Sequence, residues 1–345
     1  MSSSSNLRPY VARVLIALAL TALALLIWKL SDLVMVMFGA VVVAVLLSAM
    51  VSLLVRHARL SHGIALGVVL LLLVVGFGLL IWLFGAQLAG EMDSLKKSLP
   101  LAWTQFQAWL ASSPAGPMVE QASEQLQSSV SGLAAKAGSL ALSASGNLTH
   151  MLLMVVGGIY LAAQPKLYRE GTLKLFPADR RALLGDAMDV SGKALKSWLG
   201  GQLLAMLVIG LTTGIGLWLL GVPVAVGLGI ITALLDLGPI VGPILAAFPA
   251  VLLGFTVSPQ VALGALLLFI VLQQLESHVL QPLIQQRVVD LPPALLLVSL
   301  FGIGALFGLP GVVLAAPLTV VLYVLVKRLY VKEALDTDTS IPGDQ

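Results

Sequence analysis

Long apolar stretches alternate with short polar breaks along this chain, and three of them fall within the first 90 residues. Val14–Trp28 and Leu33–Val55 are separated only by Lys29 to Asp32, and Gly63–Gly90 carries no charged side chain. Each stretch reaches or approaches the roughly 20 residues that an α-helix needs to cross a bilayer. We therefore predict three N-terminal transmembrane helices over residues 1–90. The first two should form a helical hairpin that is not cleaved as a signal peptide.

The pattern changes over residues 91–147, where apolar side chains recur every three to four positions with Gln, Ser and Ala between them, as in "LAWTQFQAWL". This spacing is typical of amphipathic helices, and Pro114 and Pro117 interrupt it. We predict an extramembrane or interfacial helical excursion here, followed by a fourth transmembrane helix over residues 148–164. Residues 165–196 are basic and amphipathic, and we expect them to lie on the cytoplasmic membrane surface.

Residues 197–330 make up the predicted C-terminal membrane core. Leu199–Leu220 and Val261 to about Leu280 are long enough to form the fifth and sixth spans. Between them, Val224–Leu235 and Ile244–Val257 are half-length apolar pieces on either side of a break rich in proline and glycine. We predict that this segment is a broken helix, either a re-entrant hairpin or a bent full span.

A second broken segment follows the sixth span. Ala294–Phe307 and Val312–Val326 are apolar pieces around "GLPG", and the break comprises Gly308, Pro310 and Gly311. Irregular backbone at membrane depth is tolerated only where protein or water satisfies its N–H and C=O groups, and transporters place broken helices around substrate and ion sites. After this segment, residues 331–345 are predicted to be a polar cytoplasmic tail.

The first break has residues suited to the tip of a broken helix. Pro239 and Pro243 lack an amide proton and clash with the preceding turn, while Gly238 and Gly242 permit a tight reversal. A helix that begins near Pro243 leaves unpaired N–H groups at its positive end. Asp236 beside it can hold a proton or a cation, so we predict that this break lines a transport pathway.

Composition defines the class of protein. Hydrophobic residues make up 59% of the 345 and charged residues only 10%, far below the roughly 25% charged residues of soluble domains. The sequence therefore predicts an all-α polytopic membrane protein whose first partner is the lipid bilayer. There is no cysteine and no phosphate-binding loop of the G-x-x-x-x-G-K-[ST] type. We expect no cofactor, no metal, no nucleic-acid partner and no enzymatic activity.

Basic residues predict the topology. With the N-terminus inside, six full crossings and two hairpins, all nine arginines and six of the ten lysines fall on the cytoplasmic side. Both termini are then cytoplasmic. Treating the two broken segments as bent full spans gives eight crossings and moves only Arg287, so both layouts stay open. We expect a multi-pass membrane protein.

Few polar groups interrupt the C-terminal core, and these are the candidates for a substrate or ion pathway. Intramembrane ionisable groups are costly enough to indicate a role. Each has a plainer interpretation: Asp236 as a local helix cap, Glu276 as a solvated helix end, and His278 as an exposed interfacial side chain. The predicted pathway residues are Asp236, Glu276, His278, Gln273, Gln274 and Gln202.

Five motifs in order make the chain similar to a known family. They are "LFPADRR", "WLGGQLL", "LLGVPVAVGLGIITALLDLGPIVGP", "QQLESHVLQPLIQQRVVDLPP" and "GALFGLPGVVLAAPL". Together they resemble those of the autoinducer-2 exporter family, also called the PerM-like permeases, over roughly Val14 to Tyr330. Gly200 stands where that family has Arg, Asp236 where it has Asn, and His278 where it has Asn.

The resemblance implies eight membrane segments with a helical excursion after the third, in a bacterial inner membrane. It also implies export of a small solute, such as an autoinducer-2-like signal or a related metabolite, and an ion gradient is the expected energy source. We further expect a homo-oligomer. A monovalent cation (Na⁺ or Li⁺)/proton antiporter is the alternative, because Asp236 and Glu276 lie at or near the membrane. An intramembrane enzyme is disfavoured because Ser299 lacks the glycine frame of a serine nucleophile.

Overall fold

The computed structural model describes residues 7–76, 148–236, 241–280 and 291–341, together with a few isolated positions between 78 and 108. Every element among them is helical, as predicted. Four helices are long and apolar enough to cross a membrane, and a fifth span arises if one bent helix pair is counted as a single segment. These features are those of a multi-pass α-helical membrane protein.

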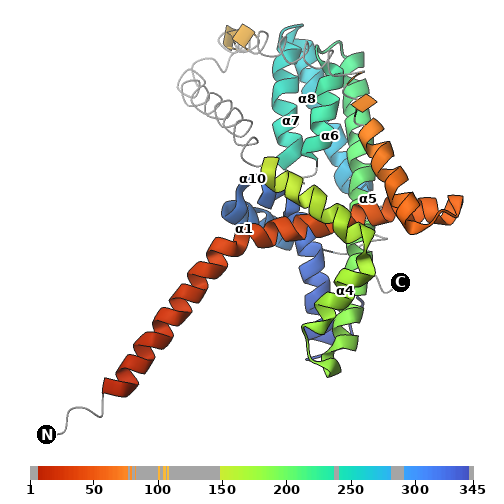
Figure 1. Ribbon diagram of the computed structural model, residues 1–345. Coiled ribbons are helices and arrows are strands. Elements are labelled where there is room, and N and C mark those ends of the chain that lie inside the picture. The colour runs from red at the N-terminus through yellow and green to blue at the C-terminus, as the bar shows by residue number, and fades with distance from the viewer. Residues whose placement is uncertain are drawn as a thin grey trace.

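The first element departs from the predicted hairpin. α1 runs without interruption from Leu7 to Ala58, through the polar residues Lys29 to Asp32 where we expected a turn. At about 1.5 Å per residue its 52 residues extend roughly 78 Å, and its N-terminal part projects away from the other helices (Figure 1). The physical reason is that the four residues Lys29 to Asp32 include neither Gly nor Pro, so nothing ends the helix there.

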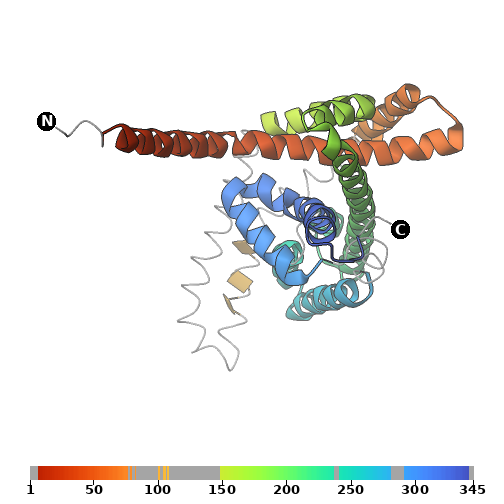
Figure 2. The ribbon, with the colours of Figure 1, turned by 90° about the horizontal axis from the view of Figure 1, so that it is seen from below.

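Two further helices pack along α1 and form a layer with it (Figure 2). These are His62–Gly76 and Leu148–Ala163, and their buried contacts with α1 include Val51, Ala65 and Ala162. Gly158 brings the helices close, since a Cβ there would lie 2.5 Å from Val43 Cγ1. His62 Nε2 also donates to the carbonyl oxygen of Ala162 at 2.8 Å.

The chain then bends by 93° into α4, Pro165–Lys174. A single 3₁₀ turn, Ala178–Arg180, leads to α5, which runs unbroken from Arg181 to Leu219. Residues 181–196 thus continue directly into the apolar part of α5. The location of residues 165–196 on the membrane surface stays a prediction. α4 packs against the beginning of α5.

The apolar part of α5 belongs to a bundle with α6 (Ala225–Leu235), α7 (Val241–Phe255) and α8 (Pro259–Leu275) (Figure 1). One buried cluster joins all four helices, and it includes Leu217, Leu228, Ala250 and Phe269. The outer face of α5 is apolar and exposed, as expected of a helix in contact with lipid. The exposed residues recur along this face: Leu203, Leu207, Leu211, Ile215 and Trp218.

α10 spans Pro293–Leu325 and is kinked at Gly308, where φ is 62° and ψ is −142°. A side chain at Gly311 would collide with the carbonyl oxygen of Ile303, so the chain bends sharply here. The predicted break is therefore present. Its second arm is longer than predicted, because the helix continues as the π-helical η3, Val326–Lys332, and 23 residues from Pro310 qualify as a full span.

The polar tail returns to the helices. Ile341 is buried in a cluster with Val190 and Ala194 of α5 and Val320 and Val324 of α10. Lys327 Nζ donates to the carbonyl oxygen of Ser340 at 3.2 Å. This end of the structure is thus held together by α5, α10 and the tail.

Candidate functional site

The break between α6 and α7 is the centre of the candidate site. Residues 237–240 lie outside the described part of the chain, so the predicted tip residues Gly238 and Pro239 are not located. Gly242 and Pro243 lie in the first turn of α7, in agreement with a helix that begins near Pro243. α6 and α7 pack side by side, and a side chain at Gly242 would collide with the carbonyl oxygen of Leu235. The segment is therefore a helical hairpin and not a bent full span.

Asp236 ends α6 and is the most enclosed ionisable group of the site. It adopts helical φ and ψ of −63° and −13°, and its backbone N–H donates to Thr232 O at 2.9 Å. The residue is only 1% exposed, and neither carboxylate oxygen has a hydrogen-bond partner among the described residues. Burying an unpaired carboxylate costs several kcal/mol, so this position favours occupation by a proton or a cation.

Gln202 of the neighbouring helix α5 contacts Asp236. Its Nε2 donates to the backbone carbonyl oxygen of Asp236 at 2.9 Å. The last carbonyl groups of a helix have no partner within the helix, and this side-chain amide satisfies one of them. The structure thus brings together two of the predicted pathway residues, which are separated by 34 positions in the sequence.

Small residues allow α5 and α6 to approach closely beside this contact. A Cβ at Gly229 would lie 2.8 Å from the carbonyl oxygen of Gly210 and 2.8 Å from Gly214 Cα. These are backbone atoms, which cannot rotate away. Backbone contact between the two helices therefore sets the spacing of Asp236 and Gln202 in this structure.

The polar run after α8 is divided between buried and exposed positions. Glu276 is 5% exposed and begins the π-helical turn η2, Glu276–Leu280, which contacts α5. Gln273 is half-buried, whereas Gln274 and His278 are exposed. The His278 ring donates from Nδ1 to Gln274 O at 3.1 Å, within its own helix. Only Glu276 and Gln273 of this group therefore face the interior.

Residues 15–330 match the sequence profile of the family described as "AI-2E family transporter". The chain belongs to this family. Its segment from α5 to α10, with both breaks, lies within the matched residues.

Relatives of this AI-2E family transporter carry provisional transport-protein names. YueF and YrrI of Bacillus subtilis (strain 168) are 35% and 32% identical, each over 48% of this chain, and the matches cover 41% and 47% of their own lengths. The chain thus aligns with less than half of each of these two proteins. MT0215 of Mycobacterium tuberculosis (strain CDC 1551 / Oshkosh) is 29% identical over 86% of this chain and 84% of its own length.

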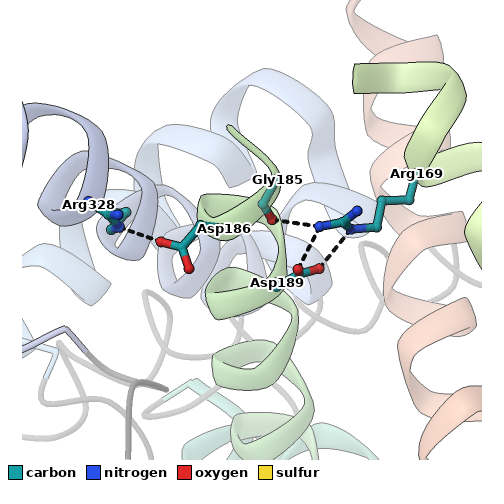
Figure 3. Close-up of polar contacts among 5 residues, drawn as sticks. All are labelled: Arg169, Gly185, Asp186, Asp189 and Arg328. Atoms are coloured by element: carbon teal, nitrogen blue, oxygen red, sulfur yellow. Dashed lines mark hydrogen bonds and ion pairs between the residues drawn. The ribbon is translucent and has the colours of Figure 1, made fainter. Parts of the chain in front are cut away.

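This member of the family also has a polar cluster that sequence reasoning missed (Figure 3). Arg169 of α4 binds Asp189 of α5 with two bonds, Nε to Oδ1 at 2.8 Å and Nη2 to Oδ2 at 2.6 Å, and Nη2 also donates to Gly185 O at 3.3 Å. Arg328 of η3 donates from Nε to Asp186 Oδ2 at 2.6 Å. We call Arg169, Asp186, Asp189 and Arg328 the ionic clamp. The spacing of Asp186 and Asp189 on one helix was the available signal, but their partners are distant in sequence.

Proposed function

We propose that this AI-2E family transporter exports a small solute, an autoinducer-2-like signal or a related metabolite, and that an ion gradient drives the export. The observation that carries the proposal is the buried carboxylate of Asp236 at the reversal between α6 and α7. We place the protein in a bacterial inner membrane as a homo-oligomer with both termini in the cytoplasm.

The proposed mechanism follows from the cost of the buried charge. When Asp236 holds a proton or a cation, the enclosed arrangement loses its electrostatic penalty; when the occupant leaves, a more hydrated arrangement is favoured. The α6–α7 hairpin is the element that changes position in this proposal. Gln202 holds the backbone of Asp236, so movement of the hairpin relative to α5 breaks or remakes that bond.

The same carboxylate supports a second candidate, a Na⁺ or Li⁺/proton antiporter. In that case Asp236 exchanges the two cations directly, and no organic solute moves. The two functions share the residue and differ in what crosses the membrane, so one preparation can distinguish them.

The test is transport by purified full-length protein in liposomes, with efflux of an autoinducer-2-like sugar and Na⁺- or Li⁺-driven proton movement measured in parallel. An amide cannot release a proton, so Asp236→Asn should retain folding and lose most of the pH dependence of sugar efflux. Asp179→Asn is the matched control, since Asp179 is an exposed carboxylate whose ion pair with Arg180 spans 3.8 Å.

The two transport assays distinguish the exporter from the antiporter. Sugar efflux with a pH profile that flattens only in Asp236→Asn supports the exporter. Cation-driven proton movement without sugar efflux replaces the exporter with the antiporter. If Asp236→Asn keeps the wild-type pH profile of whichever activity is found, Asp236 does not couple transport to protons.

A further inference from the structure

A cavity lies between the N-terminal layer and the second break, away from Asp236. Its volume is about 120 Å³. α1 contributes Asp32 and Met35, the helix Leu148–Ala163 contributes His150 and Met154, and Phe307 and Pro310 come from the two sides of the kink at Gly308. Three segments far apart in the sequence therefore meet around one space.

The walls and the mouth of this cavity differ in chemistry. Met35 is buried, and Met154, Phe307 and Pro310 add further apolar surface. Asp32 is exposed and His150 is half-buried, so the polar groups lie at the surface of the protein. Neither side chain has a hydrogen bond or ion pair with any residue in the described part of the chain. The cavity is thus amphipathic, with an unused carboxylate.

This chemistry makes several classes of ligand less favourable. The Asp32 carboxylate repels an anion. A bare inorganic cation requires about six oxygen ligands, or several His, Asp or Glu side chains, and no group of three such side chains occurs among the described residues. A purely apolar molecule gains nothing from the carboxylate and the imidazole.

An organic ammonium ion satisfies both parts of the cavity. Its N⁺–H groups form charge-assisted hydrogen bonds with a carboxylate, and its alkyl part fits an apolar wall. The ring of Phe307 and the sulfur atoms of Met35 and Met154 are polarizable neighbours for a cation. A volume of about 120 Å³ limits the ligand to a short chain.

We propose that the cavity lined by Asp32, His150, Met154 and Phe307 is a binding site for a small primary ammonium ion. The proposal does not depend on the solute exported through the α6–α7 break. Because Phe307 and Pro310 flank Gly308, the bound ion contacts α10 on both sides of its kink.

The first test is a ligand-observed NMR titration of purified full-length protein with n-butylammonium, with butan-1-ol as the uncharged ligand of similar length. Asp32→Asn should weaken n-butylammonium binding by about fivefold, the effect of losing one partly solvated charge contact. Asp32 is exposed and unpaired in the described part of the chain, so the variant should fold. Asp179→Asn, an exposed carboxylate elsewhere, should bind as the wild type does.

The second test locates the ligand. The chain has no cysteine, so a single cysteine introduced as Met154→Cys can be followed by a small thiol reagent. n-Butylammonium should slow its modification, and butan-1-ol at the same concentration should not. Equal binding by wild type and Asp32→Asn, equal binding of amine and alcohol, or no protection of position 154 would each overturn the proposal.

Discussion

Gly229 shows how much a single position can determine in this protein. No side chain fits between α6 and α5 there, because the nearest atoms are the backbone of Gly210 and Gly214. Helices in a membrane associate largely through such small residues, since lipid tails are as apolar as their side chains. The residue therefore fixes the distance between the two helices that carry Gln202 and Asp236.

We predict that Gly229→Ala lowers the free energy of unfolding by about 1–3 kcal/mol, the usual effect of overpacking a tight contact. Thermal unfolding of the purified protein, followed by tryptophan fluorescence, measures it. Gly192→Ala on α5 is the matched control: nothing lies within 4 Å of its added Cβ, so it should be neutral or slightly stabilising. Equal unfolding temperatures for the two variants would contradict the tight contact.

At the scale of elements, the ionic clamp holds α4 and η3 against opposite sides of α5 (Figure 3). The Arg169–Asp189 pair is bidentate, but its side chains are 39% and 53% exposed, so solvent weakens the attraction. Its main effect is then geometric, because the planar guanidinium fixes the orientation of α4 on α5.

We predict that Asp189→Asn lowers global stability by no more than about 1 kcal/mol, while proteolysis at the α4–α5 turn becomes clearly faster. Limited proteolysis with a protease specific for Lys and Arg measures this, since Lys174, Arg180 and Arg181 lie in or beside the turn. Asp179→Asn controls for the loss of one charge in the same region. A cleavage rate equal to that of the control would show that Arg169 does not hold α4 in place.

Sequence patterns predicted elements well where particular residue types act directly on backbone conformation. Glycine and proline at residues 238–243 and 308–311 predicted both breaks, because these residues act on local conformation. The turn predicted at Lys29 to Asp32 was wrong. The polar side chains of this segment suggested contact with solvent, but its residues have backbone preferences that allow a helix to continue. The Gln202 bond and the ionic clamp had no comparable signal. Each joins residues whose proximity depends on the packing of whole helices.

At the scale of the molecule, the N-terminal layer meets the C-terminal bundle where α1 contacts α5 and α10. One polar bond marks this contact, from Lys196 Nζ of α5 to Ser52 Oγ of α1 at 3.0 Å. Both side chains are exposed on the surface of the protein.

We predict that a protein with cysteines introduced at Ser52 and Lys196 is cross-linked efficiently by a short bifunctional thiol reagent. Peptide mapping after cleavage between α1 and α5 detects the link, and the chain has no cysteine of its own to compete. The pair of positions 52 and 197 is the control, because adjacent helix residues point about 100° apart. Similar yields for both pairs would contradict the arrangement of α1 on α5.

Because α5 is uninterrupted, a movement at one end of this helix is carried along its whole length. Its 39 residues extend about 58 Å, with the clamp aspartates near one end and Gln202 closer to the middle. A helix without an internal break transmits a tilt from end to end and does not absorb it. For a rod of this length, a tilt of only about 5° moves one end by roughly 5 Å relative to the other. Force applied at the α4 and η3 end would therefore reach the carbonyl oxygen of Asp236 as displacement.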